Sequence, residues 1–404
     1  MERQQVHKSE QLSPNMSMVI DYDEPLLKSS DILNAFNFAL DNCCSIEKYQ
    51  GSKTVYTYSH NGIKEYFLCG SITYLSHPHP IFKKRFQLKK WFKDFYNEHK
   101  NKPNERVRLI GLYHYQGLII FVDFSIGDYI ERKLNSSAAH VYSNDLFQAM
   151  TYGTFQKIDK NGNHITSVHF RKFKDYINGV AEENKIFSLF RKFNNKFVFG
   201  SWVNAVSAIT EMKSANWYQW KGTEWAGWFL EFRISNFIDS EHCESVMMYI
   251  GNIKSNDMLD FDLLFKEDGF YGDLKASDID KETAPLNDQE SVLEAINHYG
   301  RLWYIIYEHE TIKDSDRNNE MALARMQLIG KQHKENEPIS YAERMKHSVN
   351  FKRMRIFELN RINMNEVLST FNQGHQPSGQ PRAPKFLINK NNVDNYIVFS
   401  YDYQ

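Results

Sequence analysis

Apolar residues either alternate with polar ones or recur at helical spacing along most of the chain, and the two patterns together predict a mixed α and β protein. Helical spacing begins near Ser30 and continues to Leu40. Residues 54–76 hold two β-rich stretches around Asn61-Gly62, a pair typical of a tight hairpin turn. Two more strands are expected within residues 106–124.

Aromatic residues of segment 81–100 recur at near-helical spacing, with lysines between them. The segment is therefore predicted to form a basic amphipathic helix, which could contact a nucleic-acid backbone or simply bury its aromatic side in a core. Residues 160–197 also interleave cations with aromatics, a combination found on nucleic-acid surfaces. The candidate DNA contacts from these two segments are Lys83, Lys84, Arg85, Lys89, Lys90, Arg171, Lys172 and Lys174.

The net charge of −1 hides two regions of opposite charge. Residues 48–200 hold 24 Lys and Arg against 12 Asp and Glu, a net +12, whereas residues 201–404 hold 22 against 30, a net −8. Such asymmetry indicates a polyanionic partner, unless the charges are scattered over solvated surfaces. A length of 404 residues predicts two or three domains.

No apolar run approaches the roughly 20 residues that a membrane helix needs, and residues 1–15 lack the apolar segment of a secretory signal. The four cysteines show no zinc-site spacing and are too few for a disulfide scaffold. We therefore expect a cytoplasmic protein that has reduced thiols and no membrane partner.

The stretch most informative about chemistry is segment 259–277. Asp262 precedes the apolar Leu263–Phe265, the pair Asp268-Gly269 predicts a turn, and Asp273 and Lys275 lie on the returning strand. Because residues two apart on a strand share a face, two carboxylates and one ammonium are predicted to converge. Carboxylates suit Mg²⁺, and a lysine can orient or help deprotonate a water and screen charge on a phosphate. The alternative is an ordinary hairpin with exposed acids.

An acid before a short apolar strand, followed by acid-x-Lys on the next strand, resembles the PD-(D/E)xK nuclease superfamily, and particularly the type II restriction endonucleases within it. The resemblance implies that Asp262 and Asp273 bind the metal and that Lys275 aligns the attacking water. Phe261 stands where the family name has proline. Asp260 could replace Asp262, since the two share a face of the predicted strand.

The flanking segments extend this resemblance to residues 220–310. A helix is predicted over 221–233, where the superfamily often carries an additional metal-site glutamate, and Glu224 is the candidate for it. Its alternative role is a first-turn acid that complements the helix dipole. A further helix is predicted over 288–299 and an apolar strand over 302–307.

The resulting fold prediction is α/β, with three segments. Residues 1–47 are a polar, acidic amino-terminal segment, 48–180 a basic mixed α+β DNA-binding or effector domain, and 181–404 a nuclease domain. In the nuclease domain a restriction-endonuclease-like core is expected, a mixed central sheet flanked by helices.

By resemblance, the chain is expected to be a Mg²⁺-dependent, sequence-specific DNA endonuclease of a restriction system. It would act on double-stranded DNA as a homodimer, leave 5′-phosphates and have a DNA methyltransferase as partner. The alternatives are a structure-specific nuclease of repair or mobile elements and a non-catalytic DNA-binding protein.

Overall fold

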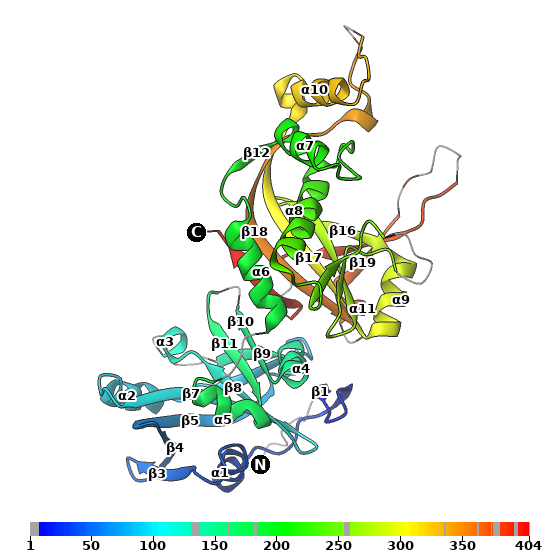
Figure 1. Cartoon of the computed structure of the whole chain (residues 1–404). Helices are drawn as coiled ribbons and strands as arrows, with labels where there is room; N and C mark the ends of the chain where they lie inside the picture. Colours follow the sequence, from blue (N-terminus) through cyan, green and yellow to red (C-terminus); the bar gives the residue numbers. More distant parts are fainter. Residues whose placement is uncertain are drawn as a thin grey trace. The chain divides into compact units, whose positions relative to one another are not determined.

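The computed structural model describes residues 8–130, 138–159, 161–180, 184–253, 259–334, 337–361, 363–372, 374, 380–391 and 395–403. The chain divides into two compact units, residues 1–183 (unit 1) and 184–404 (unit 2), each drawn with its elements in Figure 1. Residues 8–47, which were predicted as part of a separate polar segment, contribute strands and a helix to unit 1.

A large mixed sheet forms the centre of unit 1. Its strand order is β10-β11-β8-β7-β5-β4-β3, with β6 paired to β5 and β9 paired to β6; β5 and β7 are parallel and the other pairs antiparallel. The elements of unit 1 are β1 (Lys8–Leu12), β2 (Met18–Tyr22), α1 (Ser29–Ala39), β3 (Ser45–Tyr49), β4 (Lys53–His60), β5 (Ile63–Tyr74), β6 (Lys83–Gln87), α2 (Lys90–His99), β7 (Glu105–Tyr115), β8 (Leu118–Phe124), α3 (Ile126–Tyr129), β9 (Ala138–Tyr142), α4 (Ser143–Tyr152), β10 (Thr154–Ile158), β11 (His164–His169) and α5 (Phe173–Ile177).

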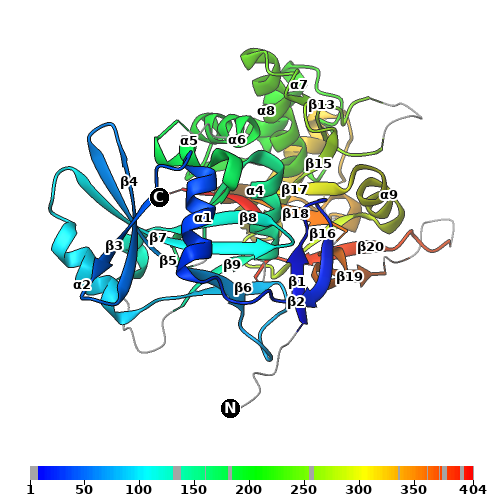
Figure 2. The same cartoon turned by 90° about the horizontal axis from the view of Figure 1, so that it is seen from below.

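Helix α1 lies across one face of this sheet, as Figure 2 shows. Its Phe36 is fully buried and stacks on Phe67 of β5 and on Phe121 of β8, with ring centroids 4.8 and 5.2 Å apart. The predicted hairpin is confirmed, because β4 and β5 pair across Asn61 and Gly62, both at positive φ. This aromatic core fixes the helix on the strands that the hairpin provides.

The prediction of one helix over residues 81–100 was wrong for its first part. Residues 83–87 form strand β6, and the helix α2 begins only at Lys90. Lys84 and Phe86 are buried whereas Lys83, Arg85 and Gln87 are partly or fully exposed. This is the period of two that a strand requires, and it competes with the helical pattern that begins downstream.

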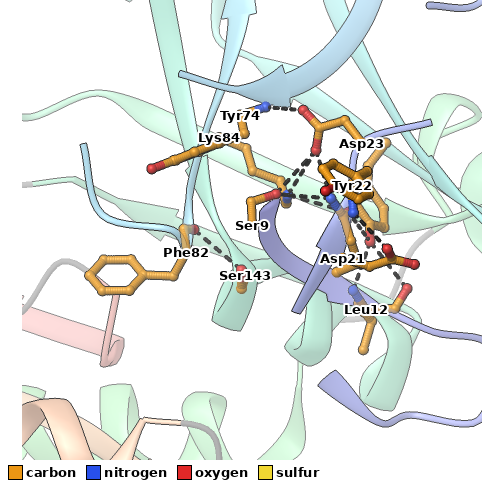
Figure 3. Close-up of polar contacts among 11 residues, drawn as sticks. Ser9, Leu12, Asp21, Tyr22, Asp23, Tyr74, Phe82, Lys84 and Ser143 are labelled. Carbon is orange, nitrogen blue, oxygen red and sulfur yellow. Dashed lines mark hydrogen bonds and ion pairs between the residues drawn. The ribbon is translucent and has the colours of Figure 1, made fainter. Parts of the chain in front are cut away.

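Lys84 was predicted to contact DNA, and the structure contradicts this prediction. Its side chain is 1% exposed and reaches back to the start of the chain (Figure 3), where Nζ donates to Ser9 Oγ at 3.1 Å and to Gln11 Oε1 at 3.3 Å. Asp23 Oδ1 lies 3.6 Å from the same nitrogen, and Asp23 Oδ2 accepts from the backbone N of Tyr74. Lys84 therefore links the amino-terminal strands to the rest of unit 1.

This buried lysine predicts a pH dependence of stability. Burial lowers the pKa of Lys84 from 10.5 to about 8, against the opposite effect of the Asp23 and Glu10 carboxylates. Between pH 8 and 10.5 the unfolded chain therefore binds more protons at this residue than the folded chain, so stability rises with pH in that window.

Urea titrations give the difference in free energy of unfolding between wild type and Lys84→Met at each pH. This difference should increase by up to about 3 kcal/mol from the low to the high end of this window. Groups that titrate in both proteins cancel in the difference. A difference that does not change with pH would contradict the prediction.

Unit 2 contains a seven-stranded mixed sheet of order β12-β18-β17-β15-β14-β13, with β21 paired to β18, and a smaller sheet of order β16-β20-β19. Of the neighbouring pairs in the larger sheet, β15 and β17 are parallel and the others antiparallel. The elements of unit 2 are α6 (Lys185–Lys196), β12 (Trp202–Asn204), α7 (Ala205–Ser214), α8 (Trp225–Glu241), β13 (Met247–Tyr249), β14 (Leu263–Phe265), β15 (Phe270–Asp278), β16 (Thr283–Asp288), α9 (Gln289–Tyr299), β17 (Arg301–Lys313), α10 (Glu320–Leu328), β18 (Lys346–Asn360), α11 (Met364–Val367), β19 (Leu368–Phe371), β20 (Lys385–Asn389) and β21 (Ile397–Asp402).

Helices cover both faces of the larger sheet. On β17, Trp303 and Tyr307 contact Phe187 and Phe193 of α6, and Phe193 also meets Phe237 of α8. The alternate β17 side chains, such as Tyr304, pack in a core shared with α9. The chain is therefore α/β with mixed sheets, which confirms the general fold class; the elements predicted around residues 221–233, 288–299 and 302–307 correspond to α8, α9 and β17.

Among the described residues, no helix is long and apolar enough to cross a membrane. The four cysteines are free, and Cys44, Cys69 and Cys243 are buried.

Candidate active site

The predicted hairpin in segment 259–277 is present as strands β14 and β15, with Gly269 of the turn at positive φ. The two strands pair only from Phe265 opposite Phe270 to Leu263 opposite Gly272. Beyond Gly272, β15 therefore continues without β14 beside it. The two candidate catalytic residues of β15 lie on this continuation.

The structure brings Asp262, Asp273 and Lys275 together. Asp262 Oδ2 accepts a hydrogen bond from the backbone N of Leu274 at 2.8 Å, where the next ladder bond would otherwise form. Lys275 Nζ forms an ion pair with Asp273 Oδ2. Asp260 is exposed, and the interaction found for it comes from its backbone oxygen. Asp262, and not Asp260, is therefore the first acid of the candidate site; the sequence alone left both residues as candidates.

A third carboxylate comes from α8, but it is Glu231 and not the predicted Glu224. Glu231 is 6% exposed, accepts from Tyr249 Oη at 2.6 Å, and adds negative charge next to Asp262. Glu224 is the N-cap residue of α8, about 10 Å away along the helix, and lies near Lys346. The prediction of Glu224 as the accessory acid is corrected accordingly.

One sequence signal could have identified Glu231. It lies between Leu230 and Phe232 in a run of residues that become buried, and a buried carboxylate in such a run requires a polar neighbour.

Burial and mutual repulsion govern the electrostatics of this acid cluster, which consists of Asp262, Asp273, Glu231 and the ammonium of Lys275. Burial, together with the charge of Asp273, raises the pKa of Glu231 to about 7 and raises the pKa of Asp262 well above its usual range. Burial alone would lower the pKa of Lys275, but Asp273 and Asp262 raise it above its usual value, so the ammonium keeps its proton. The raised pKa values indicate that one ammonium does not offset the cost of ionising these buried carboxyl groups together.

Asn287, at the end of β16, was missed in the sequence. Its Nδ2 donates to Asp273 Oδ1 at 3.3 Å and to the backbone oxygen of Asp260 at 3.1 Å, and its own backbone N donates to Tyr304 Oη at 3.4 Å. Asn287 therefore orients the second oxygen of Asp273. It comes from the other sheet of unit 2, so no local pattern links it to the hairpin.

The donor set of the acid cluster fits Mg²⁺. Among the described residues, no group of three or more His, Cys, Asp or Glu side chains has the arrangement to hold a metal ion by itself. Mg²⁺, however, usually binds one or two carboxylates and completes its shell with waters and substrate phosphate. Asp262 and Asp273 supply hard oxygen donors, and a divalent cation next to them would favour the charged carboxylates that burial and repulsion otherwise disfavour.

The remaining candidate DNA contacts in unit 1 differ in exposure. Lys89, Lys90 and Arg171 are exposed, and Lys83 and Arg85 are partly buried. Two others are engaged with acids on the surface: Lys172 lies 3.4 Å from Asp175 and Lys174 lies 2.7 Å from Asp41.

Comparison with known proteins gives one match. No curated protein and no solved structure matches the chain significantly. A family model described as Methylase-associated X1 (MTaX1) matches residues 63–177, from the start of β5 to the end of α5. The match shows that this part of unit 1 is similar to a methylase-associated family.

Proposed function

We propose that this chain is a Mg²⁺-dependent, sequence-specific DNA endonuclease of a restriction–modification system. The observation that carries the proposal is the convergence of Asp262, Asp273 and Lys275 beyond the last β14–β15 pair. The methylase-associated match in unit 1 supports the same biological setting.

The topology of unit 2 supports interpreting it as a PD-(D/E)xK nuclease core. The hairpin β14–β15 is followed by α9 and by β17, which pairs in parallel with β15, while α8 precedes the hairpin and supplies Glu231. This is the order of helix, hairpin, helix and strand expected from the resemblance. The acids lie where the hairpin ladder ends, and Lys275 beside them is partly exposed.

The proposed reaction is hydrolysis of a phosphodiester bond. Asp262 and Asp273 would hold Mg²⁺, which would supply Lewis-acid chemistry for the water and the phosphate. The ammonium of Lys275 would hold the attacking water by a hydrogen bond and neutralise charge that develops on the phosphate. The water oxygen forms the new bond to phosphorus and loses a proton to solvent, the bond to the 3′ oxygen breaks, and that oxygen gains a proton from solvent. The products carry a 5′-phosphate and a 3′-hydroxyl.

Glu231 is proposed as the accessory acid of this site. Glu231→Gln should lower the rate of DNA cleavage by about tenfold or more, because the amide removes a charge next to the metal-binding carboxylates. Glu224→Gln, in the same helix and with the same change of charge, should alter the rate by less than about twofold. Single-turnover cleavage of plasmid DNA measures both. Equal effects of the two substitutions would refute the assignment of Glu231.

In the same proposal, basic residues of unit 1 hold double-stranded DNA, and a DNA methyltransferase of the same system protects the host sites. The described part of each chain holds one such acid cluster, so cutting both strands at once would take two copies. We therefore propose a homodimer on DNA, acting in the cytoplasm.

Digestion of genomic DNA, unmodified and methylated, tests the proposed function. With Mg²⁺, the wild-type protein should produce discrete ends that sequencing maps to one short site, and EDTA should prevent cleavage. Ends scattered over many sequences would favour a structure-specific nuclease. If the DNA stays intact in every sample but is still bound, the protein would be a non-catalytic DNA-binding protein.

A further inference from the structure

A pocket of about 520 Å³ lies in unit 1 between α1, strands β4 to β6 and the start of α2. Lys53, Arg85 and Lys89 line it together with the aromatic rings of Tyr56 and Trp91. None of the described residues that line it is Asp or Glu. Its volume falls within the range of about 300–1,000 Å³ that is typical of small-ligand sites. A cavity that has three cations and no carboxylate favours an anionic ligand.

Strand geometry directs Arg85 into this pocket. Arg85 lies opposite Thr73 in the β5–β6 pair, so the two side chains share a face, whereas the adjacent Lys84 points into the buried cluster of Figure 3. Ser71, two residues before Thr73, also lines the pocket. Within the described part of the chain, Arg85 and Lys89 have no carboxylate partner. The cationic groups are therefore available to an anion that hydroxyl groups can also contact.

Trp91 adds an aromatic surface to the cationic one. Its ring stacks against Tyr49 with centroids 5.8 Å apart, and the side chain remains partly exposed. Lys53 Nζ lies 5.8 Å from the centroid of the same ring. A ring supported on one side by another ring is a platform on which a nucleobase can stack.

We propose that this pocket binds a single nucleotide. Arg85 and Lys89 contact its phosphate, and the base stacks on Trp91. If the nucleotide belongs to duplex DNA, the substrate in the proposed function, its base must leave the helical stack to enter the pocket, and this costs least for an unpaired base. The pocket then adds recognition of one base to the charge-driven binding of the DNA backbone.

Equilibrium binding to the full chain in EDTA, which prevents cleavage, tests the proposal. The probes are the four deoxynucleoside monophosphates, inorganic phosphate, a short matched duplex, and the same duplex with one unpaired base. Arg85→Gln and Lys89→Gln each remove one pocket cation, and Lys100→Gln is the matched control, since Lys100 is exposed at the carboxyl end of α2 and outside the pocket lining. Trp91→Leu removes the platform and Trp91→Phe retains it. Thermal melts confirm that each variant folds.

We expect at least one mononucleotide to bind more tightly than inorganic phosphate, and the duplex with the unpaired base to bind more tightly than the matched one. Arg85→Gln and Lys89→Gln should weaken this binding about tenfold, the effect of losing one charged hydrogen bond, and Lys100→Gln less than about twofold. Trp91→Leu should weaken it, and Trp91→Phe should restore most of it. If the substitutions affect only mononucleotide binding, the ligand is a free nucleotide. This result still supports the proposal that the pocket binds a single nucleotide.

Equal weakening by Lys89→Gln and Lys100→Gln would overturn the proposal, because it would indicate diffuse attraction. So would nucleotide binding no tighter than phosphate binding, or no binding of any probe. Failure of the nuclease proposal is distinguishable, since it would abolish cleavage and leave these binding differences intact.

Discussion

Replacing Asp273 by asparagine is expected to abolish Mg²⁺-dependent DNA cleavage, with a loss of at least about 1,000-fold, equivalent to about 4 kcal/mol of activation free energy. The amide has nearly the same shape as the carboxylate, and its oxygen can still accept from Asn287. It removes the negative charge that would bind the metal and that pairs with Lys275. Binding of duplex DNA in Ca²⁺ or EDTA should persist, because the proposed binding groups are in unit 1.

Asp280→Asn is the matched control for this experiment. Asp280 is exposed, lies two residues after the end of β15, and undergoes the same change of charge. The Asp280→Asn protein should cleave DNA at a rate within about twofold of that of the wild type. Retained cleavage by Asp273→Asn in a folded protein would remove the acid cluster from the mechanism, and equal loss in both variants would indicate a general effect of charge.

The parts of the fold that were predictable depend on interactions local in sequence. The hairpin turns at Asn61-Gly62 and Asp268-Gly269 were predictable because the glycines, and Asn61 with them, readily take the positive φ that such turns need. Asp273 and Lys275 were predicted to share a face because side chains alternate along any strand. The convergence of these two residues needed no knowledge of distant packing.

Other parts depend on packing that the sequence does not encode locally. Glu224 and Glu231 lie on the same helix, and only the docking of α8 against β15 and β13 decides which one meets Asp273. Lys84 looks like an exposed cation until the amino-terminal strands supply Ser9 and Asp23 as partners. Asn287 reaches the site from another sheet. In each case the partner is far away in sequence, and tertiary contacts override the local pattern.

The largest stability effect is expected at Glu308, in the middle of β17. Its side chain is fully buried, and its carboxylate forms ion pairs with Arg353 Nε and Arg355 Nε at 2.7 Å and with Lys390 Nζ at 3.1 Å. These cations hold the pKa of Glu308 below its usual value although burial acts in the opposite direction. Glu308→Gln removes the single negative charge that these contacts share. It should lower the free energy of unfolding of unit 2 by about 3–5 kcal/mol, because buried cations are then left without a counter-charge.

Glu310→Gln distinguishes this buried network from an ordinary surface pair. Glu310 is exposed on the same strand, its carboxylate lies 3.5 Å from Lys352, and its substitution should change stability by less than about 1 kcal/mol. Urea unfolding followed by tryptophan fluorescence reports mainly on unit 2, which holds all but one of the 7 Trp. Equal midpoints for the two variants would mean that the buried cations are stabilised without Glu308. Because Glu308 pairs with Ser277 of β15, the strand of Asp273 and Lys275, a large loss at Glu308 should also lower the temperature at which cleavage activity is lost.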